Sequence, residues 1–245
     1  MDIQTSLTRH IEILSCILKG ALAMAQTDTT VKGTIHPATP ISSDFHRQRG
    51  SLIVICGSMC SGKTEELIRI VGRLIRSGKT RIQTFKPAID NRILASHMEI
   101  DPMKHITSRT GSYIGCIATD NLEFIREYVY QKDIEVVAFD EAHFFEKVSF
   151  LNLINDLLKD GKKLIIGGLD LNFRSEPFGA MGDLLALADN VVKLSAICTQ
   201  CGVDTYCISQ RLINGQPAHY HDPLVVVGDQ QYEPRCRRCH VIKKI

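Results

Sequence analysis

One stretch of the chain, residues 51–76, constrains the fold more than any other. It begins with an apolar run at 52–56, continues with an octapeptide that contains two glycines, and ends with apolar residues at helical spacing. The octapeptide is Gly57-Ser58-Met59-Cys60-Ser61-Gly62-Lys63-Thr64. A buried strand, a glycine-bounded loop and an amphipathic helix, in this order, are typical of a loop that binds phosphate groups. The pattern predicts an α/β nucleotide-binding core.

The residues of this octapeptide, called the P-loop below, have separate chemical roles. Gly57 and Gly62 permit the backbone conformations that turn successive N–H groups toward one anion. Lys63 supplies an ammonium group for the β- and γ-phosphates of a nucleoside triphosphate, and the Thr64 hydroxyl supplies a ligand for Mg²⁺. Cys60 is either a redox-sensitive thiol or simply a loop residue, and the second interpretation is favoured. The sequence predicts binding of a nucleoside triphosphate.

Composition and charge limit the class of protein. The 245 residues are 44% hydrophobic and 23% charged, with a formal net charge of +2, which is ordinary for a globular protein. This balance gives no large basic surface for nucleic acid, and no apolar run has the length of a membrane span. We therefore expect a soluble, cytoplasmic protein with neither a nucleic-acid partner nor a membrane partner.

Residues 1–49 differ from the rest of the chain. An apolar stretch at 11–18 is interrupted by Glu12, and residues 26–49 are rich in Thr, Ser, Pro and His without periodicity. A secretory signal, an organellar transit segment, a short helical extension and a start codon placed too early are all compatible with this pattern. We expect a flexible leader over 1–49 that carries no chemistry.

Apolar strands alternate with helices after the P-loop. Strands are expected at 80–85, near 105–107, at 135–139, at 162–167 and at 191–197, and helices at 122–130, 150–158 and 184–188. This alternation implies a mostly parallel sheet with right-handed crossovers, flanked by helices. We expect a P-loop (RecA-like) α/β domain over 50–195 and a small C-terminal domain over 196–245.

Two carboxylates follow the predicted strand 135–139. Asp140 is placed to fix Mg²⁺, and Glu141 to take a proton or orient a nucleophile. With Ala142 and His143 the motif reads Asp-Glu-Ala-His, which also occurs in RNA and DNA helicases. A helicase needs a second such domain that supplies an arginine finger, and the roughly 50 residues after the first domain are too few to form one. A helicase-like NTPase remains the alternative function.

Four of the nine cysteines form two Cys-x-x-Cys pairs, Cys198 with Cys201 and Cys236 with Cys239. This spacing is typical of a zinc ribbon, and two disulfides are the weaker alternative. A closed four-cysteine site has no open position for substrate, so we expect a structural Zn²⁺ that stabilises a domain too small to build its own core. His240 is expected to be a neighbour rather than a ligand. A zinc-ribbon nucleotide sensor without turnover is the third function that these motifs allow.

The segment between the two cysteine pairs is predicted to form a lasso-like substrate loop. Because the metal site anchors both of its ends, it is suited to closing over a small substrate. Its residues include Pro223, Leu224, Val225, Val226, Val227 and Tyr232.

Several motifs in one order make the chain resemble the cellular-type (type II) thymidine kinases from about residue 50 to 243. They are the P-loop, Asp90-Asn91-Arg92, Asp140-Glu141 with Phe144-Phe145, Leu169-Asp170 with Phe173, Pro177-Phe178-Gly179, both cysteine pairs and Tyr232. The resemblance implies a kinase that transfers the γ-phosphoryl group of ATP to the 5′-hydroxyl of thymidine, or deoxyuridine. The product, dTMP, would serve nucleotide salvage for DNA synthesis. The family also implies feedback inhibition by dTTP and a homotetramer.

The resemblance assigns a role to each matching residue. Glu141 would be the base that accepts the 5′-hydroxyl proton, and Lys63 and Arg92 would stabilise charge on the transferring group. Thr64 and Asp140 would hold the Mg²⁺ that accompanies ATP. The nucleotide site would be completed by the remaining P-loop residues with Asp90, Asn91, Ala142 and His143. The nucleoside would contact Met59, Phe144, Leu169, Phe173, Pro223, Leu224, Val225, Val226, Val227 and Tyr232.

This chain departs from the family pattern at four positions. Ser58 and Cys60 stand where the family usually has proline and phenylalanine, which alters the stiffness of the P-loop more than its chemistry. His143 replaces a frequent glutamine, and Val227 stands where glycine is common, so both bear on recognition of the base. Because the catalytic residues and all four paired cysteines are intact, we expect catalysis to be intact.

Overall fold

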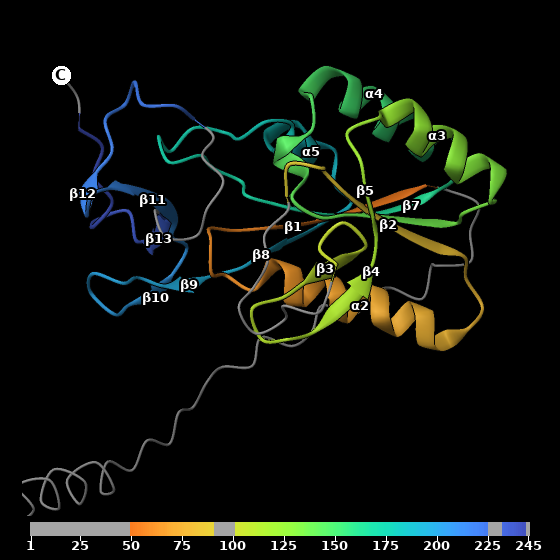
Figure 1. Cartoon of the computed structure of the whole chain (residues 1–245), viewed down its shortest axis with the longest axis horizontal. Helices are drawn as coiled ribbons and strands as arrows, with labels where there is room; N and C mark the ends of the chain where they lie inside the picture. Colours follow the sequence, from red (N-terminus) through yellow and green to blue (C-terminus); the bar gives the residue numbers. More distant parts are fainter. Residues whose placement is uncertain (1–49, 91–100, 225–231, 244–245) are drawn as a thin grey trace, which may run out of the picture. The chain divides into compact units, whose positions relative to one another are not determined.

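A six-stranded sheet in which every pairing is parallel forms the centre of the fold (Figure 1). The structure, a computed structural model, describes residues 50–90, 101–224 and 232–243. The predicted parallel α/β architecture is confirmed. Across the sheet the strands are β5 (Ile117–Ala118), β2 (Ile82–Lys86), β6 (Val136–Phe139), β7 (Lys163–Gly168), β1 (Ser51–Cys56) and β8 (Asn190–Lys193).

Helices cover both faces of this sheet. Figure 1 shows α2 (Lys63–Ser77) below the sheet, and α3 (Leu122–Gln131) and α4 (Lys147–Lys159) above it. The short helix α5 (Met181–Leu187) contributes Leu184 to the same apolar cluster as α3 and α4. Helix α2 begins directly after the P-loop and ends at Gly78, whose left-handed conformation lets its N–H bond to the Ile75 carbonyl at 3.0 Å.

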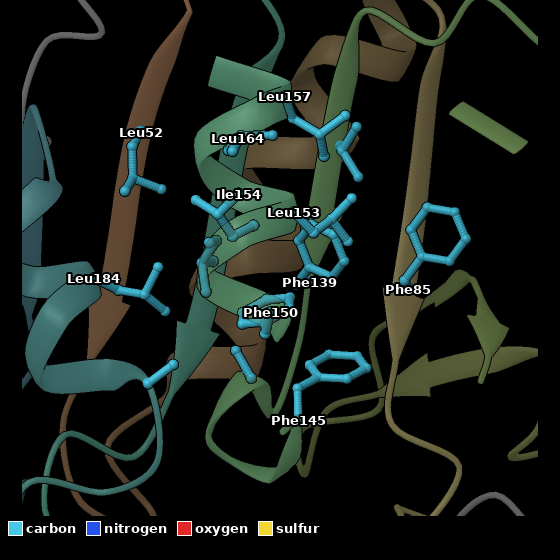
Figure 2. Packing of buried hydrophobic residues seen from close by; sticks show 14 of the residues in the cluster. Leu52, Phe85, Phe139, Phe145, Phe150, Leu153, Ile154, Leu157, Leu164 and Leu184 are labelled. Carbon is cyan, nitrogen blue, oxygen red and sulfur yellow. The ribbon is translucent and has the colours of Figure 1, made fainter. Parts of the chain in front are cut away.

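The main core lies between the sheet and the three helices α3, α4 and α5. Strand side chains alternate between the two faces, so Leu164 and Ile166 of β7 join this core while Ile165 points to the face of α2. Four aromatic rings pack together in this core (Figure 2). They are Phe85, Phe139, Phe145 and Phe150, with neighbouring ring centroids 4.6–5.9 Å apart.

Phe150 of α4 is expected to be among the most costly core positions to truncate. Its ring is fully buried, stacks on Phe145 at 4.6 Å and meets Phe139 edge-on at 5.1 Å. Phe150→Ala should lower the free energy of unfolding by about 3–5 kcal/mol, measured by chemical denaturation. Val148→Ala on the same helix is the control, because that side chain is 63% exposed and should change stability by less than about 0.5 kcal/mol. Equal effects of the two substitutions would contradict this account of the core.

Smaller antiparallel sheets carry the rest of the described strands. One hairpin pairs β3 (His105–Thr107) with β4 (Tyr113–Gly115), so the predicted strand near 105 lies outside the central sheet. The described residues from 196 onward form a two-stranded and a three-stranded sheet. Their strands are β9 (Ala196–Ile197), β10 (Asp204–Thr205), β11 (Ile208–Ile213), β12 (Gln216–Pro217) and β13 (Tyr232–Arg235).

The prediction of one strand over 191–197 is wrong. Strand β8 ends at Lys193, where the Leu194 N–H bonds to the Cys56 carbonyl at 2.8 Å and closes the ladder with β1. The chain then pairs Ala196 with Thr205 of β10 in a different sheet. An apolar run does not reveal which partner each half will find, because both halves have the same alternation. In the described part of the chain, no helix is long and apolar enough to cross a membrane.

Candidate active site

A cavity of about 500 Å³ opens at the carboxyl edge of the central sheet. Strands β1, β2, β6 and β7 run parallel, so the segments that follow them meet at this edge, where open α/β sheets bind ligands. Most of the described residues that the sequence predicted for the site line this cavity. They are Met59, Cys60, Ser61, Gly62, Lys63, Thr64, Asp90, Glu141, His143, Phe144, Leu169, Phe173, Leu224 and Tyr232.

The other predicted site residues fall into two groups. Some are described but do not line the cavity: Gly57, Ser58, Asp140, Ala142 and Pro223. Others lie outside the described residues: Asn91, Arg92, Val225, Val226 and Val227.

The P-loop connects β1 to α2 through three residues with positive φ, which are Gly57, Cys60 and Gly62. Gly57 has φ +146°, and a Cβ there would lie 2.7 Å from the Leu194 carbonyl oxygen, so the chain passes too close for any side chain. Gly62, with φ +84°, precedes the first turn of α2, which places helix N–H groups at the cavity. The Lys63 ammonium donates to the Ser58 carbonyl at 2.7 Å, across the loop. This arrangement suits a phosphate chain.

Thr64 and Asp140 meet between the P-loop and the end of β6. The Thr64 hydroxyl donates to Asp140 Oδ2 at 3.1 Å, while Asp140 Oδ1 accepts the Glu141 N–H at 3.0 Å. The Asp140 N–H in turn bonds to the Phe85 carbonyl of β2 at 3.0 Å. A hydroxyl and a carboxylate, both oxygen donors, therefore lie together beside the phosphate loop, and this donor set fits Mg²⁺.

Glu141 is held in an uncommon backbone conformation. Its φ is +49°, in the left-handed region, and its carbonyl accepts the Phe144 N–H at 3.1 Å to close the single 3-10 turn Ala142–Phe144. A non-glycine residue in this region costs on the order of 1–3 kcal/mol and is characteristic of functional sites. The turn brings Glu141 to the cavity wall, where the residue is 7% exposed.

His143 lies directly behind Glu141. Its side chain is fully buried, and its Nδ1 accepts the Leu169 N–H at 3.1 Å, while Nε2 lies 3.4 Å from Glu141 Oε2. The imidazole packs against Phe144 and Phe178, with ring centroids 4.1 Å and 4.6 Å away. The residue therefore links the end of β7 to the turn after β6.

Phe173 lines the cavity and contacts residues from the C-terminal part of the chain. The guanidinium groups of Arg174 and Arg211 lie 5.3 Å and 5.6 Å from its ring centre. Arg211 also donates to the Pro223 carbonyl, and His240 Nε2 donates to the Phe173 carbonyl at 3.0 Å. Arg211 and His240 thus hold the aromatic wall and one end of the predicted substrate loop.

Several cavity residues were missed by the sequence reasoning. The buried Ser209 of β11 accepts the Met59 N–H at 2.9 Å, and the buried Lys86 at the end of β2 pairs with Asp90 at 3.1 Å. The hairpin β3–β4 adds His105, Thr107, Ser108, Arg109 and Thr110. Lys86 could have been found from its position at a strand end, whereas the position of Ser209 depends on a contact 150 residues along the chain.

The two cysteine pairs converge on one point of the structure. The four sulfur atoms lie within 4.8 Å of one another, and Cys201 Sγ is 3.8 Å from Cys236 Sγ. Four thiolates around Zn²⁺ at about 2.3 Å would be about 3.8 Å apart, so the cluster fits a tetrahedral metal site. His240 is not part of it, in accordance with the prediction.

The pKa values of the cysteine thiols in this cluster are also compatible with metal binding. Burial raises the pKa of the Cys198 thiol, but backbone N–H groups of Cys236, Cys201 and Gln200 outweigh it and lower that pKa to about 6. The pKa of Cys239 rises to about 12, chiefly through hydrogen bonding with Cys236 and then through burial. A metal ion would release the remaining protons on binding.

Comparison with known proteins gives one family. The family model described as Thymidine kinase matches residues 50–240. A protein of Deinococcus deserti named Thymidine kinase is 43% identical over 205 residues, which are 80% of this chain and 96% of that protein.

Solved structures give a more distant likeness. Two structures of the replication initiator DnaA, one bound to AMPPCP and single-stranded DNA and one bound to AMPPCP from Aquifex aeolicus, align with 60% and 59% of this chain. Their identities are 17% and 20%, and their TM-scores are 0.36 and 0.35. The chain spans 40% of the length of those proteins. A likeness at this level supports no inference about function.

Proposed function

This chain belongs to the thymidine kinase family, and from that premise we propose that it transfers the γ-phosphoryl group of ATP to the 5′-hydroxyl of thymidine. The product is dTMP, made for nucleotide salvage, and deoxyuridine is the second substrate. The observation that carries the proposal is that the P-loop and the Glu141 carboxylate border one cavity. A phosphoryl donor and a base for an acceptor hydroxyl can therefore be bound side by side.

Phosphoryl transfer needs positioning and charge stabilisation more than covalent chemistry. In the proposed mechanism the P-loop N–H groups and Lys63 hold the phosphates, and Glu141 accepts the proton of the 5′-hydroxyl as the new bond forms. Thr64 and Asp140 would hold Mg²⁺, which would supply neutralising charge on the phosphate oxygens. Arg92 is proposed to add a second cation, although it lies outside the described residues.

The nucleoside is proposed to lie between the P-loop and the C-terminal domain. Met59 and Phe144 would flank the thymine, and Phe173 would pack on the nucleoside. Leu169, Leu224 and Tyr232 line the same cavity, which supports their assignment to substrate binding. The remaining substrate-loop residues, 225–227, are proposed to contribute backbone contacts.

Further proposals rest on family membership. They are inhibition by dTTP, assembly into a homotetramer, a structural Zn²⁺ at the four cysteines and a cytoplasmic location. We also retain the proposed domains, 1–49 as a leader, 50–195 and 196–245. The transition from β8 to β9 between Lys193 and Ala196 supports the second boundary.

One assay tests the proposed activity. Full-length protein is incubated with γ-labelled ATP, Mg²⁺ and each deoxynucleoside in turn, with and without a polynucleotide. Labelled dTMP is expected with thymidine, a weaker product with deoxyuridine, and none with purine deoxynucleosides.

The same assay separates the alternatives. ATP hydrolysis that increases with polynucleotide and not with thymidine would indicate a helicase-like NTPase. Nucleotide binding without turnover would indicate a sensor. Either result would refute the kinase.

A further inference from the structure

His143 is a buried titratable residue to which the proposed mechanism gives no part. We propose that it is a positioning residue: its imidazole Nε2–H donates to the Glu141 carboxylate and aims that carboxylate at the acceptor hydroxyl. The inference rests on the proposed role of Glu141 as the base, and it extends that role to the residue behind it.

The protonation of the imidazole follows from its backbone contact. Leu169 N–H donates to Nδ1 at 3.1 Å, so Nδ1 must present its lone pair. In a neutral imidazole the proton then lies on Nε2, the nitrogen that faces Glu141 Oε2 at 3.4 Å. The end of β7 therefore selects the tautomer that can donate to the carboxylate.

The ring has little freedom to turn away from the carboxylate. Phe144 and Phe178 pack on it at 4.1 Å and 4.6 Å, and the side chain is fully buried. The backbone of His143 is fixed as well, because a Cβ at Gly179 would lie 2.4 Å from its carbonyl oxygen. A donor held this closely can fix a flexible carboxylate without moving itself.

The geometry explains why such a donor is needed. Glu141 has several rotatable bonds and itself occupies a strained backbone position, so its carboxylate must be oriented by its surroundings. In the structure Nε2 lies 3.4 Å from Glu141 Oε2 without the geometry of a hydrogen bond. The proposed bond therefore forms fully only in the substrate complex, where catalytic hydrogen bonds commonly tighten. A glutamine at 143 could make the same bond through its amide group.

The test compares three substitutions in the full-length protein. His143→Gln retains a donor that reaches Glu141. His143→Asn can still accept from Leu169 N–H but is too short to reach the carboxylate, and His143→Leu has no polar atom. We expect kcat for thymidine phosphorylation to fall about 10- to 100-fold in the Asn and Leu variants, as for loss of a hydrogen bond to a charged group. It should stay within about threefold of wild type in the Gln variant, and KM for thymidine should change little in any of them.

Controls separate packing from positioning. Phe178→Leu disturbs the packing of the imidazole but leaves its donor, so its kcat should fall less than that of the Asn variant. Melting temperatures show whether each variant is folded. If the Leu variant is unfolded, the folded Asn variant alone provides the test. Equal kcat values in the Asn and Gln variants would overturn the inference. A wild-type protein that does not phosphorylate thymidine would overturn the proposed function, and this inference with it.

Discussion

Glu141→Gln is expected to lower kcat for thymidine phosphorylation by about 10²- to 10⁴-fold, the usual contribution of a general base. The amide has nearly the same shape as the carboxylate but cannot accept the proton of the 5′-hydroxyl. Asp140, Thr64 and Lys63 are unchanged, so the affinity for ATP and Mg²⁺ should remain within a few-fold of wild type. Single-turnover phosphorylation together with equilibrium binding of a non-hydrolysable ATP analogue measures both quantities.

The control for this substitution is Glu127→Gln on helix α3. That side chain is exposed and does not line the cavity. Glu127→Gln therefore removes one negative charge, as Glu141→Gln does, but leaves the site unchanged. Activity of the control should equal that of wild type. Retained turnover in Glu141→Gln would remove Glu141 from the mechanism and leave a different group as the base.

Cys236→Ser is expected to abolish metal binding and, with it, thymidine phosphorylation. The buried Cys236 follows β13, the strand that begins with the cavity residue Tyr232 and pairs with β11, which carries Ser209. Structural zinc sites contribute an apparent binding free energy of about 10–16 kcal/mol, more than a small domain can supply otherwise. The wild type should contain one zinc per chain by elemental analysis, and the variant none.

Cys116→Ser provides the matched control for metal content. Cys116 is also buried, which raises the pKa of its thiol to about 12, but it lies outside the cluster. The Cys116→Ser variant should contain as much zinc as the wild type. A Cys236→Ser protein that kept both its zinc and its activity would refute a structural metal at the four cysteines.

The parts of the fold that are determined locally could be predicted from the sequence. The strand before the P-loop, the helix after it and the Asp140-Glu141 pair at the end of β6 each carry their own pattern of apolar and polar residues. The four cysteines could also be grouped, because metal geometry restricts their spacing. Pairing between distant segments cannot be predicted from such local patterns. For this reason one strand was predicted over 191–197, where the structure has two strands in different sheets.

The candidate site shows the same distinction. Lys63, Thr64 and Glu141 belong to short motifs, so their approximate positions follow from the chain itself. Ser209 has no motif, and only the fold brings it to Met59. The contact between His143 and the Leu169 N–H likewise joins the turn after β6 to the residue that follows β7, through a side chain whose partner no periodicity reveals.

The hydrogen bond from Met59 N–H to Ser209 has a consequence for recombination between related proteins. It makes one backbone group of the phosphate loop depend on a hydroxyl of strand β11, 150 residues away in the chain. A chimera joined near residue 195 would inherit its loop from one parent and the acceptor from the other. Crossovers at this boundary, although it separates two sheets, should therefore be tolerated only between parents that both have a hydroxyl residue at position 209.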